Sequence, residues 1–145
     1  MNAHQFAIHG SEPLRRSTPL ASTRARTWTG RALTALVALF LAFDAIVKLL
    51  RLPMVLDANA QLGLPASSIV PIGVLALVLL AIYLIPRTAL IGAVLWTGYL
   101  GGAIAIHVRA GSPTFSVVFP LLIAALLWGG LALRDNRVRA LISPS

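Results

Sequence analysis

Residues 68–108 read SIVPIGVLALVLLAIYLIPRTALIGAVLWTGYLGGAIAIHV, and they decide the fold. They contain two apolar runs, 68–85 and 88–108, separated by a turn around Pro86. A helix needs about 20 mainly apolar residues to cross a bilayer. Lipid offers the backbone no hydrogen-bond partners, so a spanning segment is a helix or part of a closed barrel. Because neither run alternates strictly, as barrel strands do, we predict two antiparallel membrane-spanning helices.

Two further apolar segments, 30–50 and 115–133, are also long enough to cross. The last two spans are joined by the short turn RAGSP, residues 109–113, and are therefore antiparallel neighbours as well. The first connection is longer and reads LPMVLDANAQLGLP, residues 52–65. It is either a short helix at the membrane interface, ended by Gly63, or a plain loop. The predicted fold class is all-α, an integral membrane four-helix bundle.

The composition indicates a membrane protein. Of the 145 residues, 58% are hydrophobic and only 11% are charged, whereas a soluble domain has about 25% charged residues. The length suits one domain of a few spanning helices. The chain has no cysteine, which excludes disulfides, thiol redox relays and cysteine-ligated metals.

The basic residues predict the orientation, because cytoplasmic flanks of spans carry an excess of lysine and arginine. With four spans, both termini and the loop between the second and third spans lie on one side. That side has nine of the twelve basic residues, and the other side has Lys48, Arg51 and Arg109. We therefore predict cytoplasmic termini in a multi-pass protein of the cell membrane, the inner membrane of a bacterium.

The same distribution bears on the partners of the protein. The net charge of +8 reflects orientation and attraction to anionic lipid, so the lipid bilayer is the expected surrounding. Nucleic acid is not predicted as a partner, since the arginines lie in the tails without interleaved aromatic residues.

The chain divides into three parts. Residues 1–27 are rich in Ser, Thr, Pro and Arg without periodicity, which predicts a flexible, basic cytoplasmic tail. Residues 28–141 form the transmembrane domain, and residues 142–145 form a C-terminal tail. The alternative for the N-terminal part is a cleaved signal peptide, with an apolar core from Ala32 and LAFDA, residues 41–45, as a poor cleavage site.

The end of the first span, FDAIVKLLRLP at residues 43–53, carries opposite charges within an apolar run. Sixteen residues separate Arg31 from Lys48, which is about 24 Å of helix at about 1.5 Å per residue. The hydrocarbon core is about 30 Å thick, so the first span must include Asp44. Lys48 lies one helical turn later on the same face and can pair with this carboxylate, which lowers the cost of placing it in the membrane.

Two interpretations of this pair stay open. It anchors the depth and rotation of the helix, or it is half of a ligand or proton site, since ionisable residues inside a membrane mark functional sites. Other polar residues at the predicted outer end of the bundle would complete such a site. The hypothetical ligand-binding set comprises Asp44, Lys48, Arg51, Gln61, His107 and Arg109.

The third span has a face of small residues. Small residues at helical spacing let a second helix approach closely, so this face predicts helix packing in preference to a ligand cleft. The face comprises Gly98, Gly101, Gly102 and Ala105.

The sequence indicates neither a catalytic centre nor a metal site. It contains no nucleophile with a neighbouring base and no phosphate loop. Of the three histidines, His4 and His9 lie in the predicted tail, on the opposite side from His107. A metal ion at His107 would therefore need carboxylate co-ligands. We predict no metal site in this protein.

Four segments together resemble the DoxX-like family of small membrane proteins. They are FDAIVKLLRLP (43–53), LGLP (62–65), YLIPRTALIGAVLWTGYLGGAIAIHVRAGSP (83–113) and WGGLALRD (128–135). The resemblance covers about residues 28–141 and implies a four-helix membrane protein. The family is named after a small subunit of a quinone-linked sulfur-oxidising membrane complex. The resemblance therefore implies, by analogy only, a quinone ligand and subunits of a membrane redox complex as partners.

The chain departs from this family at two positions. Related sequences often have a threonine before the histidine of the third span and a second histidine after the dipeptide FS. Here Ile106 and Val117 stand at those places. The difference argues against a site built from two histidines, whether for a metal or for a quinone.

The predicted function is a non-catalytic accessory or binding subunit whose polar pocket lies at the outer end of the bundle. A quinone headgroup, a lipid or a partner protein would occupy the pocket. Two alternatives stay open. One is a structural or stress-related membrane protein without a ligand, and the other is a small transporter or channel subunit. Because the second and fourth spans contain almost no polar residues, a solute path would need a homo-oligomer.

Overall fold

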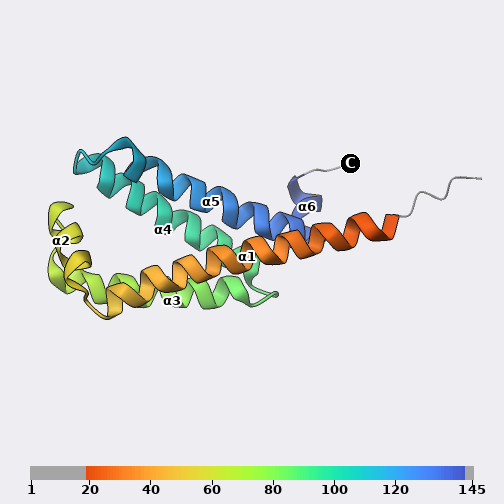
Figure 1. The fold of residues 1–145 in the computed structure, drawn as a ribbon, viewed down its shortest axis with the longest axis horizontal. Helices are drawn as coiled ribbons and strands as arrows, with labels where there is room; N and C mark the ends of the chain where they lie inside the picture. Colours follow the sequence, from red (N-terminus) through yellow and green to blue (C-terminus); the bar gives the residue numbers. More distant parts are fainter. Residues whose placement is uncertain (1–18, 143–145) are drawn as a thin grey trace, which may run out of the picture.

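The structure is a computed structural model, and it describes the backbone of residues 19–142 and the side chains of residues 24–140. All regular elements in this part of the chain are helices (Figure 1). The long helices are α1 Pro19–Leu49, α3 Ile69–Leu84, α4 Ala89–Arg109 and α5 Thr114–Arg134. Four segments are long and apolar enough to cross a membrane, namely 24–49 within α1, 66–84 comprising η1 and α3, and the whole of α4 and α5. The shorter elements are α2 Pro53–Gln61, the 3₁₀ turn η1 Ala66–Ser68 and α6 Asn136–Ile142. The predicted all-α fold with four spans is confirmed.

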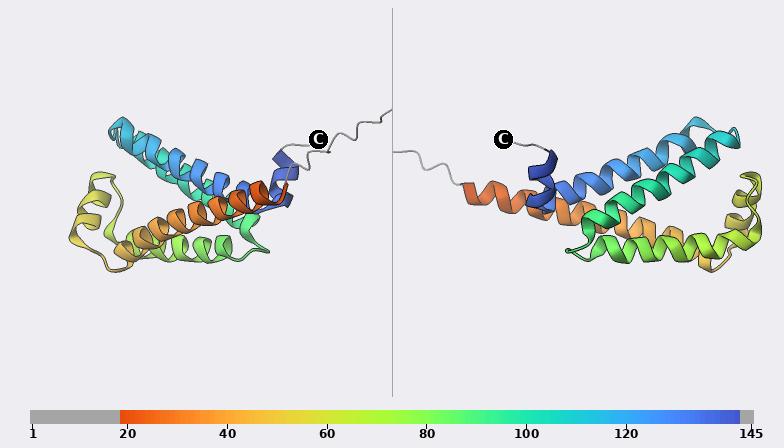
Figure 2. Two further views of the ribbon diagram at one scale, coloured as in Figure 1. Left: turned by 45° about the vertical axis from the view of Figure 1, so that its right-hand side comes forward. Right: turned by 180° about the vertical axis from the view of Figure 1, so that it is seen from behind.

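The four long helices form two pairs that diverge. α1 packs against α3 and α5, and α4 packs against the same two helices. One pair consists of α1 and α3, and the other consists of α4 and α5. The two pairs meet at one end of the bundle and separate toward the end where α2 lies (Figures 1 and 2). We call these the narrow end and the wide end of the bundle.

Glycines hold the narrow end together. A Cβ atom added to Gly92 of α4 would lie 2.5 Å from the backbone nitrogen of Tyr83 in α3, and one added to Gly30 of α1 would lie 2.8 Å from the backbone nitrogen of Arg134 in α5. No side chain fits at these distances. Glycine therefore lets the helices touch backbone to backbone, which is how spans associate in lipid.

Tyr83 is the centre of the core at this end. Its side chain is fully buried, and its hydroxyl donates a 2.9 Å hydrogen bond to the carbonyl oxygen of Leu127 in α5. The Arg134 guanidinium lies 5.1 Å from the centre of the tyrosine ring and donates to the tyrosine carbonyl oxygen at 3.2 Å. These contacts join α3 to α5, with the buried rings of Trp96 and Tyr83 filling the space between the helices.

Both ends of the described chain lie at the narrow end. The contact of Gly30 with Leu133 and Arg134 places the first part of α1 beside the last turn of α5, and α6 follows directly (Figure 1). This arrangement is the one that four antiparallel spans require. That this end faces the cytoplasm stays a prediction.

The connections at the wide end use one turn type. Arg51, Gly63 and Gly111 all have positive φ, at 50°, 70° and 64°. After each of them the next N–H group donates to the carbonyl oxygen five residues earlier, at 3.3 Å for Leu52 and 2.9 Å for Leu64. This is the Schellman motif, which satisfies the last carbonyl groups of a helix. The segment 52–65 therefore contains a helix, one of the two alternatives predicted for it, and Gly63 ends this helix as expected.

The helix boundaries differ from the predicted ones at both ends of the chain. α1 begins at Pro19, so the structure places residues 19–27 in the helix, whereas the tail was predicted to continue to residue 27. Proline suits this first position because it lacks an N–H group to leave unpaired. The other residues of the predicted tail, 1–18, lie outside the described residues.

α6 was not predicted. Its N-cap is Asp135, whose Oδ1 accepts a 2.9 Å hydrogen bond from the backbone N–H of Arg137. An aspartate in this position satisfies one of the free donors at the start of a helix. Of the predicted C-terminal tail, residue 142 ends α6, and residues 143–145 lie outside the described residues.

Candidate functional site

A cavity of about 630 Å³ lies between the diverging helices at the wide end. Five helices contribute to its wall, with α1 and α3 on one side, α4 and α5 on the other and α2 across the end. Pockets for small molecules have volumes of about 300–1,000 Å³. The cavity is therefore large enough for a small organic ligand.

Most of the wall is apolar. Phe40 of α1 and Phe119 of α5 meet edge to face, with ring centres 5.5 Å apart, and both line the cavity. The two rings form a contact between these helices at the cavity wall. Aliphatic residues, such as Leu75 of α3 and Ile123 of α5, complete this surface.

The ion pair of Asp44 and Lys48 is the charged part of the wall. The two residues are one turn apart on α1, Lys48 Nζ donates to Asp44 Oδ2, and both side chains line the cavity. Their exposed fractions are 34% for Asp44 and 16% for Lys48. The helical spacing alone brings them together, as the sequence predicts. Each ion has its partner beside it, which offsets the cost of partial burial next to apolar walls.

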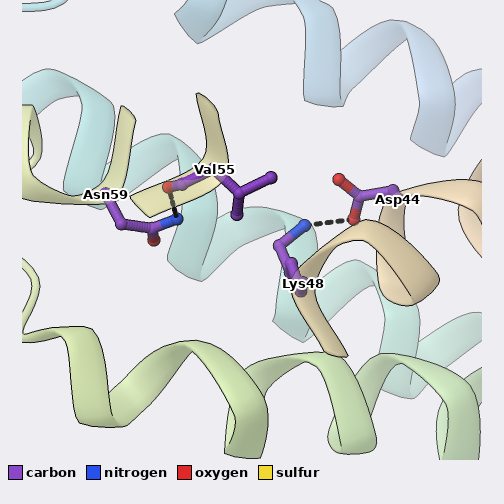
Figure 3. A network of polar contacts seen from close by, with 4 residues as sticks. All are labelled: Asp44, Lys48, Val55 and Asn59. Carbon is purple, nitrogen blue, oxygen red and sulfur yellow. Dashed lines mark hydrogen bonds and ion pairs between the residues drawn. The ribbon is translucent and has the colours of Figure 1, made fainter. Parts of the chain in front are cut away.

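Asn59 of α2 faces this ion pair across the cavity (Figure 3). It is buried, and its side-chain nitrogen donates a 2.7 Å hydrogen bond to the carbonyl oxygen of Val55, one turn earlier. Among residues 24–140, no group donates to its side-chain oxygen. The sequence analysis did not select Asn59. Helical spacing would have indicated that Asn59 shares one face with three other residues of the wall, namely Val55, Ala58 and Leu62.

His107 and Tyr99 add polar groups from α4. His107 Nδ1 is 3.1 Å from the hydroxyl of Ser112 in the following turn, and this contact limits the rotation of the imidazole. The Tyr99 ring packs edge to face on Trp96, with ring centres 4.9 Å apart. Both His107 and Tyr99 line the cavity. Tyr99 thus packs against the core and also lines the cavity, and its place in the wall was not predicted.

Half of the predicted ligand set lies outside the wall. Asp44, Lys48 and His107 line the cavity, whereas Arg51, Gln61 and Arg109 do not. Arg51 is exposed and forms the turn that ends α1, and Gln61 is exposed at the end of α2. Arg109 donates a 3.1 Å hydrogen bond from Nη2 to the carbonyl oxygen of Leu62. It therefore ties the end of α4 to the end of α2.

The small face of α4 meets no other helix in the described part of the chain. Gly98, Gly101, Gly102 and Ala105 are all exposed, and a Cβ atom added to any of the three glycines would find no atom within 4 Å. Two of them, Gly98 and Gly102, line the cavity. Close packing within the chain uses Gly30, Gly92 and Gly130 instead. Packing of the small face against another helix stays a prediction.

Metal ligands do not gather at the site. Among the residues that the structure describes, no three His, Cys, Asp or Glu side chains are placed to hold a metal ion together. The chemistry that the wall offers is therefore one ammonium and carboxylate pair, an amide, an imidazole and a phenol around an apolar space.

The comparisons with known proteins agree with this architecture. No curated protein and no solved structure matches the chain. The model of the DoxX-like family matches residues 32–130, a segment that includes α2, α3, α4, the larger part of α1 and α5, and every residue of the cavity wall. The match covers more than half of the 145 residues, so the chain belongs to the DoxX-like family.

Proposed function

We propose that this protein is a non-catalytic binding or accessory subunit that holds a lipid-soluble molecule with a polar head, such as a quinone, in the cavity at the wide end. The observation that carries the proposal is the combination of a cavity of about 630 Å³ with an ion pair in its otherwise apolar wall. Ligand pockets generally consist of apolar walls with a few polar groups that orient the ligand.

The polar groups suit a headgroup with carbonyl oxygens. A quinone needs hydrogen-bond donors beside its carbonyls and an apolar slot for its tail. Lys48 supplies an ammonium, Tyr99 a hydroxyl and Asn59 an amide. An ammonium has three N–H donors, and Asp44 occupies one of them. The other two remain for a ligand.

A side opening to the membrane would suit a ligand dissolved in the bilayer. Leu75 of α3 and Gly98 and Gly102 of α4 line the cavity and are also exposed. We infer that the cavity opens between α3 and α4, where the helix pairs diverge. Because these helices are spans, the opening would face the acyl chains of the bilayer. A lipid-soluble ligand can pass from the bilayer into the cavity without crossing water.

The wider setting follows from charge and family analogy. Redox chemistry on a bound quinone would need a partner subunit that carries the redox centre, and a membrane redox complex is suggested by analogy with the namesake of the family. The basic residues at the narrow end favour cytoplasmic termini in a bacterial inner membrane. On that orientation the cavity lies in the outer half of the bilayer.

A transporter function in a single chain receives less support. The polar groups of the wall lie at the wide end, whereas Tyr83, Trp96 and Leu127 fill the bundle nearer its narrow end with fully buried side chains. A path for solute through these described residues would have to displace the core. A transport role would therefore need several copies of the chain.

The test compares two glycine variants of α4. A leucine at Gly98 projects into the cavity, whereas a leucine at Gly101 lies outside the wall, and neither meets an atom of the chain at its Cβ. Decylubiquinone is titrated into purified protein, and quenching of tryptophan fluorescence reports binding, since Trp96 contacts Tyr99 of the wall. We expect Gly98→Leu to weaken binding about tenfold or more, as steric filling of a pocket does, and Gly101→Leu to bind like wild type.

Two results would contradict the proposal. Wild-type protein that neither binds added decylubiquinone nor carries quinone after purification in mild detergent excludes the quinone. Equal binding by the Gly98→Leu and Gly101→Leu variants would mean that the probe binds elsewhere on the protein.

A further inference from the structure

We infer that the narrow end of the bundle has a second, separate site, which binds a phosphate group. A cavity of about 180 Å³ lies there, where α1, the turn between α3 and α4, the start of α4 and the end of α5 meet. Its wall consists of Arg31, Pro86, Ala89, Leu131, Arg134 and Asp135. The site is at the opposite end from the quinone cavity and does not depend on the function proposed for that cavity.

Arg134 is held in place by the core. Its guanidinium stacks 5.1 Å from the ring centre of Tyr83 and donates one hydrogen bond, at 3.2 Å, to the Tyr83 carbonyl oxygen. A guanidinium has five N–H donors. Among residues 24–140 its polar contacts are all with Tyr83, through the carbonyl oxygen and the tyrosine side chain, so Arg134 presents a fixed group with N–H donors left for a ligand.

Arg31 supplies a second guanidinium from α1. Its only described contact is with the ring of Trp28, 5.8 Å from the guanidinium carbon, and it donates no hydrogen bond within the described residues. Two guanidiniums around one small cavity match the several oxygens of a phosphate, because the planar guanidinium donates two parallel N–H bonds to such groups.

The carboxylate in the wall does not neutralise this pair. Asp135 Oδ1 accepts the backbone N–H of Arg137 as the N-cap of α6. In the described part of the chain, Asp135 forms no ion pair within 4.0 Å with either arginine of the wall. Two guanidiniums and one carboxylate leave a net positive charge around the cavity.

The position of the cavity suits the phosphate of a phospholipid. Ala89 is the first residue of α4 and Arg134 is the last residue of α5, so the cavity lies where the apolar spans end and the headgroup region begins. Basic pockets between spans at the cytoplasmic side bind anionic headgroups. The same chemistry would also accept free inorganic phosphate, and the experiment separates these two sources.

The test uses the full-length protein in mild detergent and native mass spectrometry with added phosphatidylglycerol, phosphatidylcholine or inorganic phosphate. The variant is Arg31→Gln, and the matched control is Arg137→Gln, an exposed arginine at the same end that is not part of the wall. Losing a charged hydrogen bond costs about tenfold or more in affinity. We expect this loss of phosphatidylglycerol binding for Arg31→Gln, and a change of less than about twofold for the control.

The outcomes assign the source of the phosphate or overturn the site. Competition by millimolar inorganic phosphate would identify free phosphate as a ligand, whereas retention of phosphatidylglycerol against it identifies the lipid. Equal loss in the Arg31→Gln and Arg137→Gln variants, or binding of phosphatidylglycerol by Arg31→Gln that is as tight as by the wild type, would overturn the proposal. Thermal unfolding of the variants checks that Arg31→Gln is folded, as expected for an exposed side chain.

Discussion

The ion pair of Asp44 and Lys48 shows how one turn of helix solves a local problem. The apolar part of α1 that follows Arg31 is too short to cross lipid without this aspartate, and the lysine four residues later pairs with it. Both side chains then line the cavity. The pair can therefore serve the stability of the helix and the binding of a ligand, and the two roles can be separated by substitution.

We predict that Lys48→Met destabilises the protein by about 1–3 kcal/mol, because the half-buried carboxylate loses its partner. In the double variant Asp44→Asn with Lys48→Met, no carboxylate remains without a partner. We expect this variant to recover most of the lost stability. Thermal unfolding in detergent measures both effects. If the double variant is as unstable as the single one, the charges are not the cause. A stable double variant that no longer binds ligand would assign the pair to binding.

At the scale of the helices, the tightest contacts depend on single glycines. Gly92 lets α4 touch the backbone of α3 at Tyr83, and Gly30 does the same for α1 and α5. The cluster of glycines later in α4, which looks like a packing motif in the sequence, meets no helix of the described chain. Local spacing identifies a face on which small residues gather, but the crossing points of the helices select the glycines that are used.

Gly92→Ala and Gly101→Ala provide a matched pair within α4. The added methyl group at Gly92 would lie 2.5 Å from backbone atoms of Tyr83, which cannot move aside easily, so we expect a loss of about 1–3 kcal/mol from overpacking. The methyl group at Gly101 enters open space, and this variant should be as stable as wild type. Thermal unfolding in detergent measures the stability of both variants. Equal stability of the two variants would contradict the contact between α3 and α4.

For the whole molecule, the divergence of the two helix pairs creates two different ends. The narrow end is closed by glycine contacts and by Tyr83, and it carries the small basic cavity. The wide end holds the large apolar cavity, with α2 across it and Arg109 tying α4 to α2. The orientation of these ends in the membrane decides which of the two cavities faces the cytoplasm.

We predict that the narrow end is cytoplasmic, from the positive-inside rule. The chain has no cysteine, so each single-cysteine variant carries one thiol. Ala110→Cys lies at the wide end in the turn after α4, and Arg137→Cys lies in α6 at the narrow end, both at exposed positions. In intact bacterial cells an impermeant maleimide should label Ala110→Cys, and it should reach Arg137→Cys only after permeabilisation. The reverse pattern would mean that the termini face outward.

The amino-acid sequence was sufficient for the properties that depend on local chemistry. The number of spans and their approximate limits follow from the length of each apolar run against the thickness of a bilayer. The pairing of Asp44 with Lys48 follows from helical spacing, and the end of α2 follows from Gly63.

The contacts between helices depended on the folded structure. In a soluble protein an apolar stripe shows which face of a helix is buried. Lipid is as apolar as the protein core, so both the lipid-facing and the inner faces of these spans are mainly apolar. Hydrophobicity therefore does not show which face of a span is buried. The crossing points of four helices therefore decided that Gly92 packs and Gly98 does not. They also placed Asn59 and Tyr99, rather than Arg51 and Gln61, around the cavity.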